Sequence, residues 1–295
     1  MRKKFLPFAV CVVIALLFVG YGFSHRSDVV YTSSDIQILE ANKERERKVR
    51  PLSGKTIAFF GDSITKLGNV LVDKVAQDTG ANCINYAFSG CRMATYLNDV
   101  YSHFSMGALA SSISQNNFSE QENALDDAGN QKPYYTDTIN LLKNADFADI
   151  EYICIAYGTN DWNANVPLKS NNAEDINTFE GALRYAINVI NNKNPKLKIF
   201  VCTPIYRFTL KDGAVFEDSD TKENKINLKL KDYADSIKKV CDEYDITVID
   251  LYSEMDFNKT TAGKYFSGDD GVHPNQTGRA LMGAKIAENI LKELE

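Results

Sequence analysis

Short continuous apolar runs that alternate with longer helical stretches constrain the fold of this chain most strongly. Strands buried on both faces are typically continuous apolar runs, whereas surface helices repeat their apolar residues every three to four positions. Five such runs occur, and the first four are followed within two residues by Gly or Pro; they lie at 56–60, 83–88, 152–157, 198–202 and 247–250. Stretches with helical spacing lie at 67–78, 176–190, 222–243 and 275–294. The alternation predicts an α/β fold of three layers, in which helices cover both faces of a mainly parallel five-stranded sheet.

Residues 100–150 do not fit this alternation. They form a polar stretch that is longer than a crossover between two parallel strands needs. Long segments of this kind are commonly functional. We therefore expect an insertion that shapes the substrate side of the protein or acts as a lid, and we assign no fold to it.

The N-terminus predicts export from the cytoplasm. Residues 2–4 are basic, and residues 5–23 carry no charge. A membrane-spanning helix needs about 20 apolar residues, and its basic flank stays in the cytoplasm. We expect residues 1–23 to be an uncleaved transmembrane helix; a cleaved signal sequence is the alternative, and both place the rest of the chain outside the cytoplasm. A buried core helix is disfavoured because the run has no polar face. We expect residues 24–53 to be a polar stalk and residues 54–295 to be the folded domain.

The charge of the chain limits its partners. The chain has 33 Lys and Arg and 39 Asp and Glu, a net charge of −6. Residues 1–23 hold three of the basic residues and none of the acidic ones, so the remainder has 30 against 39 and a net charge of −9. This balance argues against a nucleic-acid partner. It also disfavours strongly anionic polymers as substrates, unless a local basic patch compensates.

The six cysteines suggest neither a metal site nor a redox site. Cys11 lies in the apolar N-terminal run, and the other five have no Cys-x-x-Cys spacing. Cys154 and Cys202 lie in predicted strands and are expected in the core. Cys83 and Cys91 are close enough in sequence to pair in an oxidising compartment, if their geometry permits.

Polar and small residues gather just after the predicted strands. The carboxyl ends of parallel strands lie at one edge of a sheet, and ligands bind there. In chain order, the residues that follow the strands are Ser63, Gly90, Asn160 with Asp161, Tyr206 with Arg207, and, after a longer loop, Asp270 with His273. We therefore expect these groups to share one rim of the sheet.

Ser63 and His273 have the chemistry of a nucleophile and its base. A hydroxyl is a poor nucleophile at neutral pH unless a base accepts its proton. Of the three histidines, His25 lies beside the apolar N-terminal run, and His103 lies in the polar stretch without an obvious carboxylate. His273 is therefore the expected base, although Ser63 considered alone could be only a helix N-cap.

Asp270 is the expected partner of this base. It lies three residues before His273. A carboxylate there can hold the imidazole Nδ1–H and leave Nε2 to accept the serine proton. Asp269 ranks second for this role, and a plain turn followed by a helix start is the alternative interpretation of the segment.

Three groups at the same rim can stabilise an oxyanion. Ser63 offers its backbone N–H at a helix start, Gly90 a backbone N–H that no side chain shields, and Asn160 a side-chain amide. The alternative for Gly90 and for Asn160 is that each only forms a turn.

Four further residues are weaker candidates for substrate binding. They are Asp62, Asp161, Trp162 and Arg207. Trp162, the only tryptophan, can stack on a sugar ring or pack beneath the 100–150 segment. Arg207 can hold an acidic group of the substrate or form a surface salt bridge.

Four blocks of this chain resemble those of one protein family. Phe-Phe-Gly-Asp-Ser-Ile-Thr at 59–65, Ser-Gly at 89–90, Gly-Thr-Asn-Asp at 158–161 and Asp-Gly-Val-His-Pro-Asn at 270–275 are similar to the blocks of the SGNH (GDSL-type) hydrolases. The resemblance runs in the family's order from Lys55 to the end of the chain. It implies a flavodoxin-like sheet, ester hydrolysis through an acyl-serine, and no metal or cofactor. The family's Ser, Gly, Asn and His map onto Ser63, Gly90, Asn160 and His273, and its Asp maps onto Asp270.

The sequence thus predicts a membrane-tethered serine esterase that acts outside the cytoplasm. We expect a monomer that removes short acyl groups, foremost acetyl, from a small molecule or polysaccharide and binds no nucleic acid. The acetyl and carbohydrate parts rest on the resemblance and the predicted location. The alternatives are a lipase or lysophospholipase, an acyltransferase that passes the acyl group to a sugar, and a non-catalytic carbohydrate-binding module on a hydrolase frame.

Overall fold

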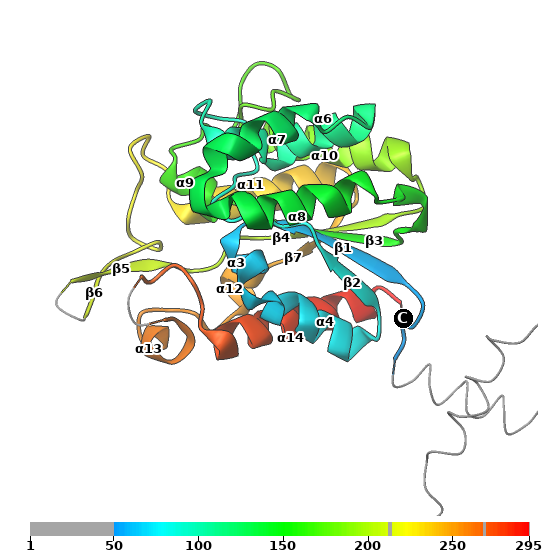
Figure 1. The fold of residues 1–295 in the computed structure, drawn as a ribbon. Helices are drawn as coiled ribbons and strands as arrows, with labels where there is room; N and C mark the ends of the chain where they lie inside the picture. Colours follow the sequence, from blue (N-terminus) through cyan, green and yellow to red (C-terminus); the bar gives the residue numbers. More distant parts are fainter. Residues whose placement is uncertain (1–49, 212–213, 268–269, 295) are drawn as a thin grey trace, which may run out of the picture. The chain divides into compact units, whose positions relative to one another are not determined.

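Five parallel strands form the central sheet, in the order β2-β1-β3-β4-β7 (Figure 1). This computed structural model describes residues 50–211, 214–267 and 270–294, all within one unit that spans residues 45–295. The strands are β1 (Thr56–Gly61), β2 (Asn82–Asn85), β3 (Tyr152–Ala156), β4 (Lys198–Cys202) and β7 (Thr247–Ile249). The prediction of a parallel five-stranded sheet is confirmed, and its strand order is the flavodoxin-like one.

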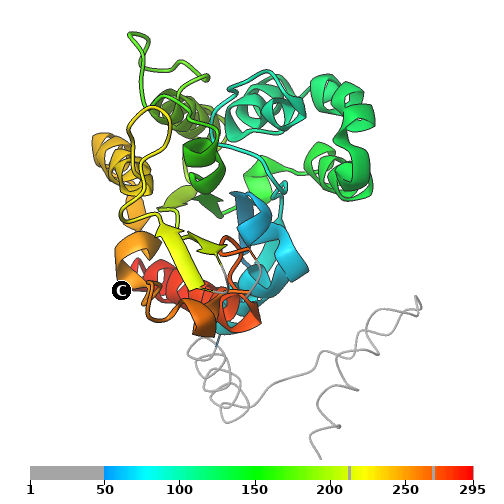
Figure 2. The same cartoon turned by 90° about the vertical axis from the view of Figure 1, so that its left-hand side faces the viewer.

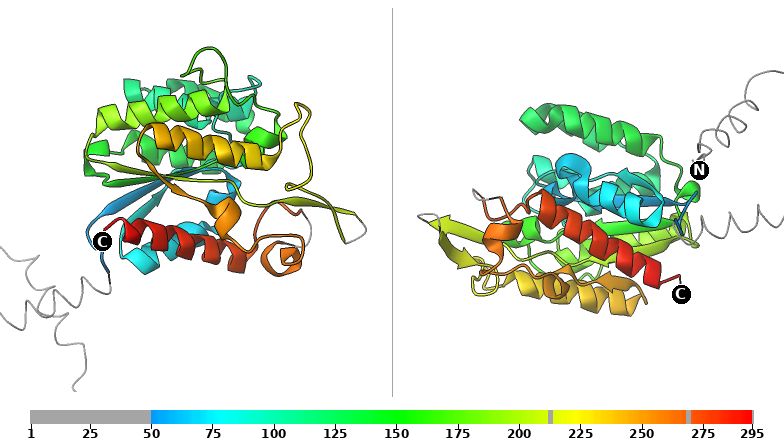
Figure 3. Two further views of the ribbon diagram at one scale, coloured as in Figure 1. Left: turned by 180° about the vertical axis from the view of Figure 1, so that it is seen from behind. Right: turned by 90° about the horizontal axis from the view of Figure 1, so that it is seen from below.

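Helices cover both faces of the sheet, as Figures 1 and 3 show. Helices α4 (Val70–Thr79) and α14 (Gln276–Lys292) pack against each other on one face. The other face is covered by α6 (Met106–Gln115), α8 (Lys132–Lys143), α10 (Phe179–Lys193) and α11 (Leu230–Glu243). Side chains alternate along each strand, so neighbouring residues such as Phe59 and Phe60 enter separate apolar cores.

Polar residues set the starts of the long helices. The Thr178 side chain accepts a hydrogen bond from the backbone N–H of Gly181 at the start of α10. Asn275 does the same for Gly278 at the start of α14. Such N-caps satisfy backbone donors that have no partner within the helix and typically stabilise it by about 1 kcal/mol.

Residues 100–150 form helices that belong to the helical layer. Besides α6 and α8, the segment contains α5 (Val100–His103), α7 (Ser119–Ala124) and the 3₁₀ helices η2 (Leu125–Gln131) and η3 (Phe147–Asp149). Leu109 and Ile113 of α6 are buried, and α6 packs along α10. The segment therefore supplies part of the core, which the expectation of an insertion or lid did not foresee. Figure 2 shows these helices grouped on one side of the domain.

A protruding hairpin and a loop follow β4. The antiparallel strands β5 (Phe208–Lys211) and β6 (Ala214–Asp218) form the hairpin, which extends beyond the sheet in Figure 1 and in the left view of Figure 3. The prediction of a helix over 222–243 was wrong at its start, because α11 begins only at Leu230. The Asn224 side chain instead accepts hydrogen bonds from the backbone N–H groups of Ile226 and Leu228 and holds this part as a loop. Ile226 in this loop is exposed.

Short helices complete the fold. They are α3 (Ser63–Lys66), the 3₁₀ helix η1 (Leu67–Asn69), α9 (Thr159–Asn163), α12 (Leu251–Glu254) and α13 (Ala262–Tyr265). Helices α3 and α9 start shortly after β1 and β3 end. They carry predicted site residues at the carboxyl edge of the sheet.

The predicted N-terminal helix of residues 1–23 and most of the predicted stalk lie outside the described residues. Within the described part, no helix has the length and apolar character to cross a membrane. Leu52, which we assigned to the stalk, is 2 % exposed, and its backbone N–H donates a hydrogen bond to the Thr79 carbonyl oxygen. The folded domain therefore begins before residue 54.

The described cysteines are all free thiols. Cys154 and Cys202 are buried on neighbouring strands, as predicted, with their sulfur atoms 3.4 Å apart. Cys83 and Cys91 do not pair: Cys83 is half-buried, whereas Cys91 is fully buried and its sulfur lies 3.4 Å from the Tyr135 hydroxyl.

Candidate active site

A cleft of about 700 Å³ lies where the carboxyl ends of the strands meet the loops. It brings together Ser63, Gly90, Asn160, Arg207, Asp270 and His273, which come from segments far apart in the sequence. These are the residues that the sequence places after the strands, apart from the buried Asp161 and Tyr206.

Ser63 is presented to the cleft by the turn from β1 into α3. Asp62 is the N-cap of α3, and its carboxylate accepts a hydrogen bond from the Ile64 N–H at 2.9 Å. Ser63 is therefore the first residue of the helix and is half-buried. Its Oγ lies 2.8 Å from Nε2 of His273, a residue 210 positions later in the chain.

The loop before α14 holds the His273 ring. Asp270 Oδ2 lies 2.5 Å from Nδ1 of His273, and Asp270 Oδ1 accepts the backbone N–H groups of Val272 and His273 at 2.8 and 2.9 Å. Burial opposes ionisation of this carboxyl, but the hydrogen bonds from the ring and the two amides outweigh it and hold the pKa of Asp270 below its ordinary value. An ionised Asp270 favours the ring tautomer that carries its proton on Nδ1, so Nε2 can accept a proton from Ser63.

The β5–β6 hairpin supports this loop from the side. Phe208 donates its backbone N–H to the Gly271 carbonyl oxygen at 2.9 Å. Gly271 has φ = +65°, and a Cβ there would lie 2.3 Å from the Phe208 carbonyl oxygen. Only glycine fits between Asp270 and His273 at this close approach.

The remaining histidines lie elsewhere. His103 pairs with Glu120 at the protein surface, at 2.9 Å. His25 and Asp269, the second-ranked partner of His273, lie outside the described residues.

Asn160 and Gly90 face the same cleft as Ser63. The Asn160 Nδ2 donates to the Cys91 carbonyl oxygen at 2.9 Å and lies 3.4 Å from Asp62 Oδ2. Gly90 has φ = +82°, in the left-handed region. Within the described residues, the backbone N–H groups of Ser63 and Gly90 have no hydrogen-bond acceptor. The two backbone donors are therefore not used by hydrogen bonds within the described residues, whereas the Asn160 amide already has two acceptors, Cys91 at 2.9 Å and Asp62 at 3.4 Å.

Asp62 and Asp161 are buried and do not line the cleft. The prediction that they contact substrate was wrong, and both bind backbone N–H groups of the protein itself. Asp161 Oδ2 and Oδ1 accept the backbone N–H groups of Met93 and Ala94 at 2.9 and 3.0 Å. Burial raises the pKa of Asp62 to about 7 and that of Asp161 to about 6. Both carboxyls fix loops around the cleft.

Trp162 is 6 % exposed, and its indole N–H donates to the Leu228 carbonyl oxygen at 2.9 Å. The Arg207 guanidinium lies over the indole, 5.3 Å from the ring centroid. Trp162 therefore packs beneath the loop before α11, and the Arg207 guanidinium covers part of its ring.

Arg207 lines the cleft and forms no ion pair with another described residue. Its Nη1 donates to the carbonyl oxygen and hydroxyl of Thr159 at 3.2 and 3.0 Å. Burial lowers the pKa of its guanidinium. The surface salt bridge considered for Arg207 is thus not found among the described residues.

Several cleft residues were not expected from the sequence; among the larger polar ones are Tyr101, Gln131 and Arg279. Tyr101 and Gln131 belong to the 100–150 segment, which has no recognisable motif. Arg279 follows the N-cap of α14 by four residues, and its Nη1 donates to the Pro274 carbonyl oxygen at 2.9 Å. Its position one helical turn beyond the His273 segment was the available signal. No group of three or more metal-binding side chains occurs within the described parts of the chain.

Comparisons with solved structures agree with this architecture. A possible lipase from Chitinophaga pinensis is 18% identical with a TM-score of 0.53, covering 81% of this chain and 98% of that chain. A protein from Lactobacillus plantarum is 19% identical with a TM-score of 0.55, covering 82% of this chain and 97% of that chain. A salicylyl-acyltransferase from a tetracycline biosynthetic pathway is 12% identical with a TM-score of 0.51, covering 82% of this chain and 55% of that chain. At these identities the likeness shows the fold alone.

The family comparison goes further. No curated protein matches the chain. The model of the GDSL-like lipase/acylhydrolase family matches residues 59–281, a range that includes Ser63, Gly90, Asn160, Asp270 and His273. The resemblance to the SGNH (GDSL-type) hydrolases is thereby confirmed, and the chain belongs to the GDSL-like lipase/acylhydrolase family.

Proposed function

We propose that this protein is a serine esterase that removes short acyl groups, foremost acetyl, from carbohydrate. One observation carries the chemistry: Ser63 Oγ, the His273 ring and the Asp270 carboxylate are joined by contacts of 2.8 and 2.5 Å at the wall of one cleft. A hydroxyl, an imidazole and a carboxylate in this order are the parts of a nucleophile, its base and the group that orients the base.

In the proposed reaction, Ser63 Oγ attacks the ester carbonyl carbon while His273 Nε2 accepts the hydroxyl proton. Asp270 keeps the ring oriented and stabilises the imidazolium that forms. The imidazolium then protonates the leaving alcohol, which departs and leaves an acyl-serine. A water molecule, deprotonated by the same ring, attacks the acyl carbon. The bond to Ser63 Oγ then breaks as the imidazolium returns its proton to Oγ, which releases the acid and restores the serine.

Negative charge develops on the carbonyl oxygen in both steps. We assign the backbone N–H groups of Ser63 and Gly90 and the Nδ2 of Asn160 as its donors. The two backbone donors have no acceptor among the described residues. The amide donates one proton to Cys91 at 2.9 Å, and in the proposed reaction it turns the other from Asp62, 3.4 Å away, to the oxyanion. Such preorganised donors are worth about 10²–10³ in rate each.

The lining of the cleft supports a short acyl group on a polar substrate. Leu67, Tyr101 and Val272 are its main apolar side chains, and they are interspersed with polar ones. A smaller pocket of about 320 Å³ adjoins the cleft at Leu67 and is lined by Tyr134 and Tyr135. A longer acyl chain would enter this pocket, so acyl-length preference tests the proposal directly.

The test uses the purified full-length protein. Hydrolysis of p-nitrophenyl acetate, labelling by a fluorophosphonate, and loss of both in Ser63→Ala are expected. A chain-length series from acetate to palmitate should favour acetate; a preference for long chains would make the protein a lipase. Acetate release from a panel of acetylated polysaccharides, including peptidoglycan, identifies the carbohydrate.

Two further outcomes would change the assignment. Acylated sugar products in place of free acetate would indicate an acyltransferase, the activity named for one of the structural neighbours. A wild-type protein that neither hydrolyses esters nor reacts with the fluorophosphonate would be a carbohydrate-binding module.

We also propose that the domain works outside the cytoplasm as a monomer tethered by residues 1–23. The charge-free run after three basic residues supports the tether. Protease treatment of intact cells, with and without permeabilisation, tests the location, and light scattering of the purified protein tests the monomer.

A further inference from the structure

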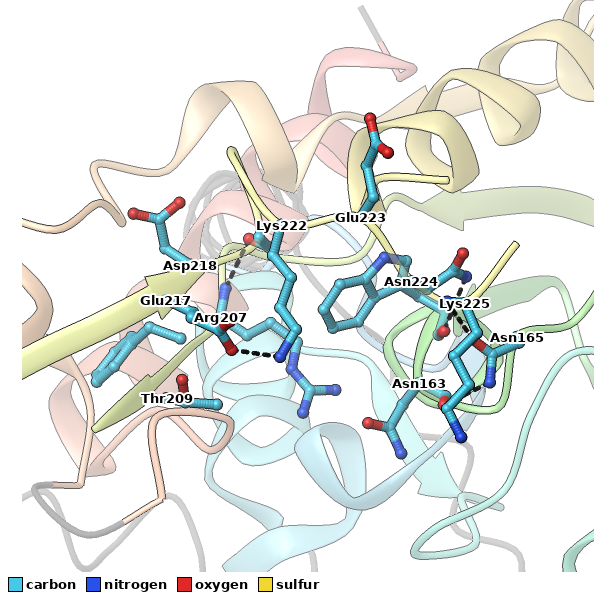
Figure 4. A pocket seen from close by; sticks show the side chains of 13 residues that line it. Asn163, Asn165, Arg207, Thr209, Glu217, Asp218, Lys222, Glu223, Asn224 and Lys225 are labelled. Carbon is cyan, nitrogen blue, oxygen red and sulfur yellow. Dashed lines mark hydrogen bonds and ion pairs between the residues drawn. The ribbon is translucent and has the colours of Figure 1, made fainter. Parts of the chain in front are cut away.

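A second pocket, of about 250 Å³, lies beside the catalytic cleft. We call it the hairpin pocket, because strands β5 and β6 and the loop over 219–225 form most of its wall (Figure 4). Asn163 and Arg207 line both this pocket and the cleft that holds Ser63. A molecule with its ester bond over Ser63 can therefore extend past Arg207 into the hairpin pocket.

Internal hydrogen bonds hold the pocket open. Asn224 Nδ2 donates to the Trp162 carbonyl oxygen at 3.0 Å, while its Oδ1 accepts the Leu228 N–H at 3.0 Å. The indole N–H of Trp162 donates to the Leu228 carbonyl oxygen. The loop is thus tied to α9, the helix that carries Asn160. A preformed pocket binds a ligand without the entropic cost of ordering a loop.

The lining of the pocket suits a sugar and not an acyl chain. Most lining side chains carry amide, hydroxyl, ammonium or carboxylate groups, and Figure 4 shows them gathered around the pocket. Among the described residues, the Asn163 amide, the Thr209 hydroxyl and the Lys225 ammonium have no hydrogen-bond or ion-pair partner, and all three residues line the pocket. Burying a hydrocarbon chain against such groups would leave them without hydrogen bonds, whereas sugar hydroxyls can satisfy them.

The charges of the lining favour an uncharged ligand. The lining contains three carboxylates (Glu217, Asp218 and Glu223) and three cations (Arg207, Lys222 and Lys225). Lys222 reaches Glu217 at 2.5 Å, as the dashed line in Figure 4 shows. Asp218 accepts the Asp220 and Thr221 backbone N–H groups at 3.2 and 3.1 Å. The six lining charges sum to zero, so the pocket has no net charge that would require an ionic ligand.

We propose that the hairpin pocket is a binding subsite for one uncharged pyranose, the sugar next to the one that bears the ester. The proposal rests on the proposed function, because it takes the substrate to be an acylated carbohydrate. Its size allows a single ring, and its position beyond Arg207 makes it a specificity-determining site for glycan length.

The test compares two substrates that differ by one ring. They are a monoacetylated methyl pyranoside and the same compound extended by one unacetylated, uncharged pyranose. For the wild type, we expect kcat/KM to be about tenfold higher for the substrate with the second ring. This ratio corresponds to about 1.4 kcal/mol of additional binding free energy in the transition state. Thr209→Trp places a large side chain from the exposed face of β5 into the pocket, and it should remove this rise. The readout is the ratio of the two kcat/KM values within one preparation.

Thr260→Trp is the matched control, since Thr260 is exposed and lies outside the pocket; it should keep the wild-type ratio. Thermal unfolding shows whether the Thr209→Trp variant is folded. If this variant does not fold, Lys225→Ala replaces it in the test and should lower the ratio several-fold. An equal ratio in wild type and in the folded pocket variants would overturn the proposal.

Direct binding separates this proposal from the proposed function. Calorimetric titration of Ser63→Ala with the unacetylated disaccharide needs no catalysis. Binding that is lost in Ser63→Ala/Thr209→Trp supports the subsite even if no ester is hydrolysed. Ester hydrolysis by the wild type without any gain from the second ring would leave the esterase proposal intact and reject the subsite.

Discussion

The Asn160 side chain donates a hydrogen bond to the backbone carbonyl oxygen of Cys91 at 2.9 Å, across 69 positions of the chain. This bond ties α9 to the loop after β2, and Gly90 is the residue before Cys91. Two of the proposed oxyanion donors therefore hold each other in place. A change at Asn160 acts both on its own donor and on the position of the Gly90 N–H.

Asn160→Ala should lower kcat for p-nitrophenyl acetate by at least about 10²–10³, with a small change in KM, because the amide acts on the charge that develops in the transition state. Asn171→Ala is the matched control, since Asn171 is an exposed asparagine that does not line the cleft. Steady-state kinetics of both variants decides. A loss below threefold would remove Asn160 from the proposed donors.

Asp270→Asn should lower kcat by roughly 10³–10⁴ while the loop stays folded. The Asn oxygen can still accept the Val272 and His273 backbone N–H groups, but the amide NH₂ would face Nδ1 of the ring. The ring must then carry its proton on Nε2, so it can no longer accept the Ser63 proton. Asp127→Asn, at an exposed acid, controls for the change in net charge. Near-normal turnover by Asp270→Asn would show that another group orients His273.

Gly90→Ala should destabilise the fold and slow catalysis. The φ of +82° costs an L-residue roughly 1–2 kcal/mol, and the new Cβ would lie 2.7 Å from Cε1 of Tyr101. The Tyr101 side chain is exposed and can turn aside, so most of the stability loss should come from φ. Urea unfolding of Gly90→Ala, Tyr101→Ala and the double variant separates the two causes. Full recovery of stability in the double variant would mean that the Tyr101 contact, and not φ, makes Gly90 necessary.

Asp62 should make the protein less stable as the pH rises. Its pKa is about 7 in the folded protein against an ordinary 3.8, so the folded state binds more protons than the unfolded state between these values. The cost of its ionisation is absent below the unfolded pKa and grows until the pH passes the folded pKa. Asp62→Asn keeps an acceptor for the Ile64 N–H and removes this cost.

Between pH 5 and pH 8, the unfolding free energy of Asp62→Asn should therefore rise relative to that of the wild type by about 2.5 kcal/mol. Urea unfolding at several pH values measures it, with Asp127→Asn as the control for net charge. Parallel pH profiles of Asp62→Asn and the wild type would contradict the prediction.

Much of the fold could be predicted because its signals are local. A buried strand such as 152–156 is a continuous apolar run, and a helix such as α14 begins at an asparagine cap. Parallel strands bring their carboxyl ends to one edge, so Ser63 and His273 could be expected together without knowing any contact. The ends of the strands were predicted less accurately. The apolar run over 83–88 continues for three residues after β2 ends at Asn85.

Other features depend on contacts between distant segments. The loop before α11 has helical apolar spacing, yet Asn224 and Trp162 hold it in another conformation through hydrogen bonds to residues about 60 positions away or within the loop itself. In the 100–150 segment, α6 is built of small residues, and its burial against α10 could not be foreseen from its own composition.

The sequence by itself determined the sheet, the order of its strands along the chain and the chemical groups at its carboxyl edge, since these follow from residue types and short-range periodicity. Only the tertiary structure decided that Asp62 and Asp161 are buried in the support of the cleft and that Arg207 covers Trp162. The same holds for the hairpin pocket beside Ser63. Burial and side-chain pairing across long sequence separations are set by packing, and no local pattern encodes them.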